Sequence, residues 1–174
     1  FQQLDAIAFG AGPGSFTGLR SACAVAQGLG FGAAVPLLPV DTLLAVAEQA
    51  RLHVQTGESL DVLALLDARM DEMYAASYRY HAGVWTRRRA PMLLKPEQLQ
   101  TLLDLEPVRA LAGNVFEVYG QRLANSTLAR VAAWPGAAAM LRLAPALLQA
   151  GAAVPPAQAL PIYIRDKVAQ TTQE

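Results

Sequence analysis

The sequence has little of what metal centres and disulfide frameworks require. Its 174 residues contain one cysteine, Cys23, and two histidines, His53 and His81. A single cysteine excludes a disulfide framework and a cysteine-rich zinc site. The histidines lie far apart and form no His-Glu-x-x-His pattern, so we expect surface or loop positions for both rather than metal binding or general-base catalysis.

Charge is also scarce. Charged residues make up 16% of the chain, and 14 basic side chains balance 14 acidic ones, whereas a typical soluble domain is about 25% charged. A neutral chain lacks the basic surface that grips nucleic acid, so we expect no RNA binding by this chain alone. The chain is 53% hydrophobic, which excludes general disorder and leaves part of the surface poorly solvated, as at a partner interface.

Unbroken apolar runs are absent. The longest uncharged stretch, residues 21–40, is interrupted by glycines and prolines, whereas a membrane helix needs about 20 continuous apolar residues. A signal peptide has a charged segment followed by an apolar core, and we find no such pattern in this sequence. These features predict a cytoplasmic protein that crosses no membrane. Because the first residue is Phe1 and residues 1–3 resemble the end of an earlier element, we also expect an N-terminal segment to be missing.

Strand patterns alternate with helix patterns along the chain, which predicts an α/β fold with a mixed sheet. A hairpin with a short loop at residues 81–83 is expected, and Ser15 or Thr17 and then Asp41 or Thr42 are candidate helix caps. The predicted strands are residues 4–9, 35–40 (starting late or at a sheet edge because of its prolines), 60–67, 73–80, 84–89 and 108–112. The predicted helices are residues 17–30, 43–53, 96–105, 115–124 and 137–149.

The densest motif is the glycine-rich run at residues 10–20, between a predicted strand and a predicted helix. Gly12, Gly14, Ser15 and Thr17 could face a phosphate, because such turns bring backbone N–H groups and a helix N-terminus close to an anion. The run lacks the spacing of a P-loop, a dinucleotide fingerprint or a nucleophile elbow. Spacing alone therefore favours a structural turn over phosphate binding.

Two charged segments have a functional and a plainer interpretation. The carboxylates of residues 67–72 could hold a metal or act as acid and base, but an ion-pair cluster around Arg69 is favoured. The arginines at 87–89 could contact RNA phosphates within a larger complex, or form a solvated strand edge that discourages pairing. No catalytic constellation emerges from the residues themselves.

The run from Gly12 to Arg20 resembles the signature of the TsaB (YeaZ) family of bacterial tRNA threonylcarbamoyladenosine biosynthesis proteins. Agreement continues along nearly the whole chain, at residues 35–36, 40–43, 67–69, 72, 74, 113–114 and 161–167. The resemblance implies an actin-like ATPase, ribonuclease H-like fold in two lobes. Residues 1–57 would be the remainder of an incomplete N-terminal lobe with a partner-binding helix. Residues 58–174 would be the C-terminal lobe with the hairpin and closing helices.

The resemblance also implies a role without catalysis. The chain would pair with a TsaD-type paralogue, work with a TsaE-type ATPase, and meet tRNA only through that complex. The complex modifies the adenosine beside the anticodon of tRNAs that read codons starting with A. TsaD-like proteins carry a metal-binding Val-Asn-His-x-x-x-His stretch; here Thr42 and Val46 stand where its histidines would be. We therefore expect no catalytic residue and no metal ligand.

The helix after the glycine turn is the expected interface. By the resemblance, Phe16, Leu19, Arg20, Cys23 and Ala26 would contact the TsaD-type partner, or a second copy in a homodimer; alternatively, this stripe packs on its own sheet. No cofactor is expected, with weak nucleotide binding at most in the full-length protein or complex. The other hypotheses are an independent actin-fold ATPase or kinase-like enzyme, a glycoprotease-like metallopeptidase, and an unrelated α/β binding module.

Overall fold

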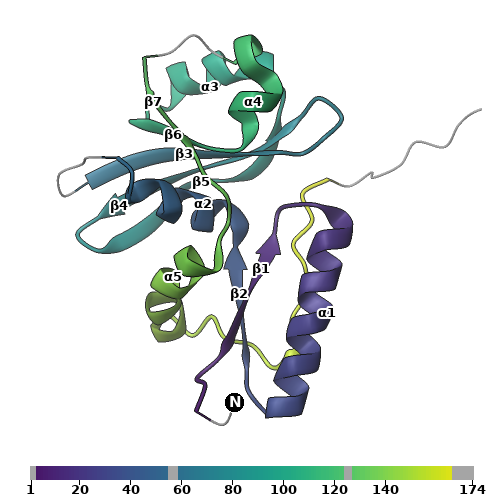
Figure 1. The fold of residues 1–174 in the computed structure, drawn as a ribbon. Coiled ribbons are helices and arrows are strands. Elements are labelled where there is room, and N and C mark those ends of the chain that lie inside the picture. The colour runs from purple at the N-terminus through teal and green to yellow at the C-terminus, as the bar shows by residue number, and fades with distance from the viewer. Residues whose placement is uncertain (1–2, 55–58, 124–126, 166–174) are drawn as a thin grey trace, which may run out of the picture.

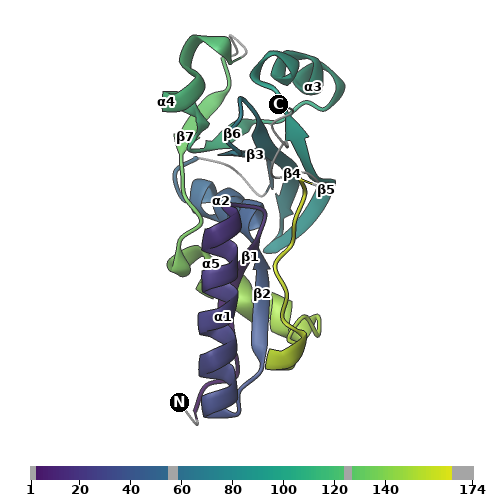
Figure 2. The same ribbon diagram turned by 90° about the vertical axis from the view of Figure 1, so that its right-hand side faces the viewer.

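The computed structural model describes residues 3–54, 59–123 and 127–165. They form a parallel two-stranded sheet and a mixed five-stranded sheet, with helices on both faces of each (Figure 1 and Figure 2). The sheets are joined through α2 (Thr42–Arg51), which packs under the five-stranded sheet and contacts both strands of the smaller one. The predicted α/β class with a mixed sheet is confirmed.

The smaller sheet pairs β1 (Ile7–Gly12) with β2 (Leu37–Asp41). Helix α1 (Phe16–Ala33) covers one face and α5 (Ala137–Gln149) the other (Figure 1). Neighbouring strand residues serve opposite faces: Leu37 packs in the cluster with Cys23, and Leu38 in the cluster with Leu143. Burial on both faces explains why β2 is an uninterrupted apolar run rather than an alternating one.

The larger sheet has the order β5-β4-β3-β6-β7. Its strands are β3 (Ser59–Asp67), β4 (Met73–His81), β5 (Val84–Leu94), β6 (Ala110–Gly113) and β7 (Ala129–Ala132). β3 pairs antiparallel with β4 and parallel with β6, and its side chains alternate between two cores. One core lies against α2, and the other is closed by α3 (Leu99–Leu105) and α4 (Val115–Tyr119).

Most predicted elements are present, with shifted ends. β1 continues through Gly10 and Gly12, which pair with Val40 and Asp41, so the strand occupies residues predicted as a turn. The helix predicted at 115–124 is replaced by α4, which ends at Tyr119, and a 3₁₀ turn, since Gly120 has a φ of 48°. β7 was not predicted, because three of its four residues are exposed and show no alternation. β5 runs past Pro91, which an edge strand tolerates.

Domain organisation is more interleaved than two consecutive segments. The boundary predicted at residues 57 and 58 lies outside the described residues. After β7 the chain returns to the smaller sheet, where α5 packs and Val154 bridges to Leu37. The predicted division into residues 1–57 and 58–174 therefore stays a prediction, and the packing places α5 and the residues up to 159 with the start of the chain. Within the part of the chain described, no helix is long and apolar enough to span a membrane.

Candidate functional site

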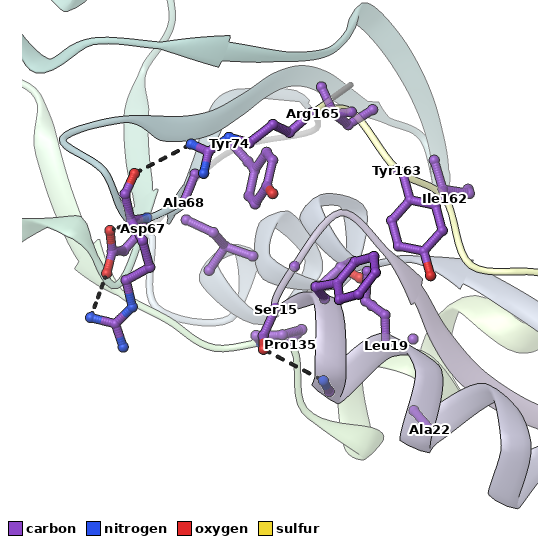
Figure 3. Close-up of a pocket in the computed structure, with 18 of the residues that line it drawn as sticks. Ser15, Leu19, Ala22, Asp67, Ala68, Tyr74, Pro135, Ile162, Tyr163 and Arg165 are labelled. Carbon is purple, nitrogen blue, oxygen red and sulfur yellow. Dashed lines mark hydrogen bonds and ion pairs between the residues drawn. The ribbon is translucent and has the colours of Figure 1, made fainter. Parts of the chain in front are cut away.

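A cavity of about 720 Å³ lies between the two sheets, and we call it the central cavity (Figure 3). Its walls come from the start of α1, the turn between β3 and β4, the loop after β7, and a C-terminal segment. That segment, residues 160–165, runs from the smaller sheet to the larger one, and we call it the strap (Figure 1 and Figure 2). The topology thus brings four distant segments to one opening.

The glycine turn forms one wall, but only part of it faces the cavity. Gly14 and Ser15 line the cavity, whereas Gly12 and Thr17 are not among the lining residues. The backbone N–H of Gly12 donates to Thr42 Oγ1 at 2.9 Å, and the Ser15 hydroxyl caps α1 by accepting from the N–H of Gly18 at 3.5 Å. Internal hydrogen bonds therefore use part of the predicted phosphate-facing turn; whether the rest binds an anion stays a prediction.

Thr42 and Val46, the two positions compared above with metal-binding histidines, have structural roles. Thr42 is 6% exposed and braces the glycine turn through its hydroxyl, while Val46 is fully buried in the core between α2 and the larger sheet. Among the residues that the structure describes, no three histidine, cysteine, aspartate or glutamate side chains cluster as a metal site would.

The acidic run at the end of β3 is divided among three arginines. Asp67 pairs with Arg69 at 3.2 Å, Asp71 with Arg122, and Glu72 with Arg165. This confirms the ion pair predicted around Arg69. Asp67 also accepts from the Tyr119 hydroxyl at 2.8 Å and raises the pKa of that phenol, although burial is the larger cause. Its carboxylate is therefore engaged in structure.

Two donors in the cavity have no partner among the residues that the structure describes. The residue Tyr74 is 8% exposed, and its hydroxyl, which points into the cavity in Figure 3, makes no hydrogen bond to a described residue. The side-chain oxygen of Asn114 accepts from the N–H of Asp67 at 2.9 Å, but within the described ranges its amide nitrogen finds no acceptor. The cavity therefore offers two neutral donors to an occupant.

The mouth of the cavity is apolar and aromatic. Five exposed large side chains line it: Phe16, Met70, Trp134, Ile162 and Tyr163. The rings of Phe16 and Tyr163 lie 5.4 Å apart, and the Arg20 guanidinium lies 3.8 Å from the centre of the Phe16 ring. Arg20 also donates from Nε to the Tyr163 hydroxyl at 3.1 Å. Sequence reasoning assigned Phe16 and Arg20 to an interface; the structure places Phe16 at this mouth, with Arg20 against its ring but not among the lining residues.

The other three predicted interface residues lie in the chain's own core. Leu19, Cys23 and Ala26 are 8%, 5% and 4% exposed, and the thiol of Cys23 donates to the backbone oxygen of Ala159 at 3.3 Å. These residues form the apolar stripe of α1. The stripe packs on the smaller sheet, because a helix that covers a sheet turns its apolar face toward the core. The outward face of α1 carries Val25, Leu29 and Phe31, exposed by 63%, 44% and 62%. Val25 and Leu29 are four positions apart, so the same helical period would have found this pair, whereas Phe31 lies at the other side of the outward face.

The arginines of β5 are partly tied into the fold. Arg87 lies 4.0 Å from Asp41, and Arg89 donates to Glu106 at 2.7 Å; Arg88 is exposed. They belong to an edge strand, as the plainer interpretation held.

One buried carboxylate, that of Glu48, joins elements that belong to the two sheets. Glu48 of α2 is 2% exposed and accepts from Arg51, Trp85 and Arg142, which join α2 to β5 and α5. Burial acts to raise the pKa of Glu48, but these hydrogen bonds outweigh it and lower the pKa.

Comparisons with known proteins agree along the chain. The family model for TsaD, tRNA N6-adenosine threonylcarbamoyltransferase, matches residues 1–173. The tRNA threonylcarbamoyladenosine biosynthesis protein TsaB of Escherichia coli K12 is 34% identical over 171 residues, which cover 95% of this chain and 73% of that protein. TsaB of Haemophilus influenzae is also 34% identical, over 95% of this chain and 72% of that protein.

Solved structures show the same likeness. YeaZ from Pseudomonas aeruginosa superposes with a TM-score of 0.79 and 37% identity, over 93% of this chain and 74% of that one. A second structure, of a protein with similarity to peptidase YeaZ from the same organism, gives a TM-score of 0.80 and 35% identity, over 94% and 75%.

Proposed function

This chain belongs to the TsaB (YeaZ) family of tRNA threonylcarbamoyladenosine biosynthesis proteins, and on that premise we propose that it is a non-catalytic, activating subunit. The expected resemblance and the actin-like, ribonuclease H-like fold are confirmed. The complex that it would serve transfers a threonylcarbamoyl group to the adenosine beside the anticodon of tRNAs reading codons that start with A.

The observation that carries this proposal is the use of Thr42. Its buried hydroxyl accepts from the N–H of Gly12, so the position compared with a metal-binding histidine braces the glycine turn. Four positions later Val46 fills the core. The side chain of Val46 and the Thr42 hydroxyl, which already accepts a hydrogen bond, cannot replace imidazole ligands. This supports catalysis by a TsaD-type paralogue rather than by this chain.

The partner surface that we propose is the outward face of α1. Val25, Leu29 and Phe31 are exposed there, and a side-chain carbon added to Gly28 or Gly32 would meet no atom within 4 Å. Small residues between large apolar ones let another helix approach closely, which favours a helical interface. The TsaD-type paralogue is the proposed occupant, and a second copy of this chain is the alternative in its absence. A TsaE-type ATPase and tRNA would be engaged through the complex.

We propose no resident cofactor, with weak nucleotide binding at most in a complex. Arg165 and Arg69, which line the cavity, already pair with Glu72 and Asp67. A triphosphate would have to displace these carboxylates, so its charge gains little. Calorimetric titration of ATP with Mg²⁺ tests this, and micromolar affinity for the chain alone would contradict it.

Reconstitution tests the role. TsaD-type and TsaE-type proteins, a threonylcarbamoyl-adenylate source and tRNA are combined with or without this chain, and modified adenosine is quantified. Modification should depend on the chain, and equal modification without it would overturn the proposal.

A pair of variants tests the surface. Leu29→Glu should weaken binding to the TsaD-type protein at least about tenfold, because it places a charge in an apolar interface. The control Leu141→Glu changes another exposed apolar residue, on α5 (69% exposed, against 44% for Leu29), and should bind normally. If both variants bind alike, the interface is elsewhere.

A further inference from the structure

The strap forms one wall of the central cavity and is fastened at both ends. At the α1 end, the N–H of Ile162 donates to the backbone oxygen of Ala11 at 2.7 Å, and the Tyr163 hydroxyl accepts from Arg20. At the other end, Arg165 reaches the turn between β3 and β4 (Figure 3). The strap therefore links the two sides of the cavity that belong to different sheets.

The turn that Arg165 reaches has an unusual backbone. Arg69, Met70 and Asp71 have φ angles of 60°, 53° and 63°, all in the left-handed region. Residues with a Cβ disfavour this region, and three in succession rarely occur. Such strain persists only where surrounding contacts hold it. The turn is therefore a segment whose conformation depends on its partners.

Arg165 supplies several of those contacts. Its guanidinium donates to the carboxylate of Glu72, to the backbone oxygen of Arg69 at 3.4 Å and to the sulfur of Met70 at 3.2 Å. Its side chain is 12% exposed, so water screens its ion pair with Glu72 less than it screens an ion pair on the surface. One side chain thus fastens the strap and holds the strained turn at the same time.

We propose that Arg165 is a latch that holds the strap against the central cavity, with the turn at 69–71 acting as a spring against it. In the docked state, which the structure shows, the latch contacts balance the backbone strain. Release of Arg165 lets the turn relax and the strap leave Ala11, which widens the cavity between the sheets. A partner or ligand that binds the open state would shift this balance. The latch goes beyond the proposed function and does not depend on it.

Hydrogen exchange at the Ile162 amide tests the latch, because that amide is protected only while the strap is docked. Arg165→Ala should accelerate its exchange by about tenfold or more, and Glu72→Gln should accelerate it less, since the contacts to Arg69 and Met70 remain. The amide of Leu63, in the interior strand β3, serves as the internal control and should be unchanged. Acceleration of both amides together indicates general destabilisation and overturns the proposal, as does unchanged exchange at Ile162.

A matched pair of variants tests the spring. Arg69→Ala and Arg69→Gly both remove the exposed ion pair with Asp67 and keep the backbone oxygen that Arg165 binds. Only glycine also removes the strain at position 69, because it adopts positive φ freely. The glycine variant should therefore exchange Ile162 several-fold more slowly than the alanine variant. Equal exchange in the two variants would show that the turn stores no strain that acts on the strap.

An opened cavity should also be measurable directly. The fluorescence of 1-anilinonaphthalene-8-sulfonate, which reports accessible apolar surface, should rise on Arg165→Ala in proportion to Ile162 exchange. Faster exchange of the Ile162 amide without added dye binding would show that the strap does not cover the apolar surface of the cavity, and would overturn the proposal.

Discussion

The phenolic oxygen of Tyr78 in β4 lies 2.7 Å from Oδ2 of Asp41, the residue that caps α2. One carboxylate thus completes a helix N-terminus with one oxygen and joins that helix to the larger sheet with the other. Tyr78 is 1% exposed, and burial raises the pKa of its phenol far above the ordinary value. The connection between the sheets therefore depends on polar groups that are largely removed from water.

Stability should depend on pH through Asp41. Burial raises its pKa above 3.8, although hydrogen bonds from Tyr78, Leu44 and Leu43 oppose the shift. The folded state holds this proton more tightly than the unfolded chain, so the contribution is fully present below pH 3.8 and is lost as the pH rises through the raised pKa. Urea unfolding of the wild type and Asp41→Asn, which keeps the cap, should show the advantage of the wild type falling as the pH rises from below 3.8 through the raised pKa of Asp41. A constant or growing advantage would contradict this prediction.

Glu48→Gln should destabilise the protein by about 1–3 kcal/mol, because the substitution removes the charge that Arg51 and Arg142 share in a buried position. The pKa of Glu48 is lowered, so its stabilisation is present above pH 4.5 and is lost as the pH falls through the lowered pKa. Denaturant unfolding at neutral and acidic pH measures both effects. Glu117→Gln, at an exposed position of α4, is the matched control and should change little. A similar loss of unfolding free energy in the two variants would contradict the role of Glu48 in binding Arg51 and Arg142.

Thr42→Val should cost about 1–3 kcal/mol although it keeps the shape of the side chain, because the N–H of Gly12 loses its acceptor in a buried turn. Thr42→Ser retains the hydroxyl and is the control. Thermal or denaturant unfolding measures the difference. If the serine variant loses as much stability as the valine variant, the packed methyl group matters more than the hydrogen bond.

Gly113→Ala should prevent folding or cost more than about 4 kcal/mol, since a Cβ there would lie 1.6 Å from the backbone oxygen of Leu65 and φ is 148°. Gly83→Ala meets no atom within 4 Å and has only the strain of φ at 88°, so about 1 kcal/mol is expected. Expression and unfolding of the two variants distinguish contact from backbone strain. A Gly113→Ala variant as stable as Gly83→Ala would show that β6 can move away from β3.

Local chemistry decided the elements that the sequence predicted correctly. The stripe of Leu19, Cys23 and Ala26 recurs at the helical period, and these residues are the buried face of α1. The predicted caps are present at Ser15 and Asp41, and the hairpin turns at Ala82 and Gly83, both with positive φ. The motif beginning at Gly12 also identified the family. Each of these signals depends on residues within a few positions of one another.

Only the tertiary structure shows which distant residues meet around the central cavity and between the two sheets. No local pattern brings Arg142 to Glu48, which are 94 positions apart, or Arg165 to Glu72, which are 93 apart. Nor does it show that Arg69, Met70 and Asp71 adopt left-handed backbone, because their side chains disfavour that conformation and contacts from distant residues such as Arg165 help to hold it. The sequence by itself determined the helices, most of the strands and the family, since these follow from periodicity, capping and motif. The fold decided which residues line the cavity and how the strap is held beside it, because both depend on the return of the chain from the smaller sheet to the turn between β3 and β4.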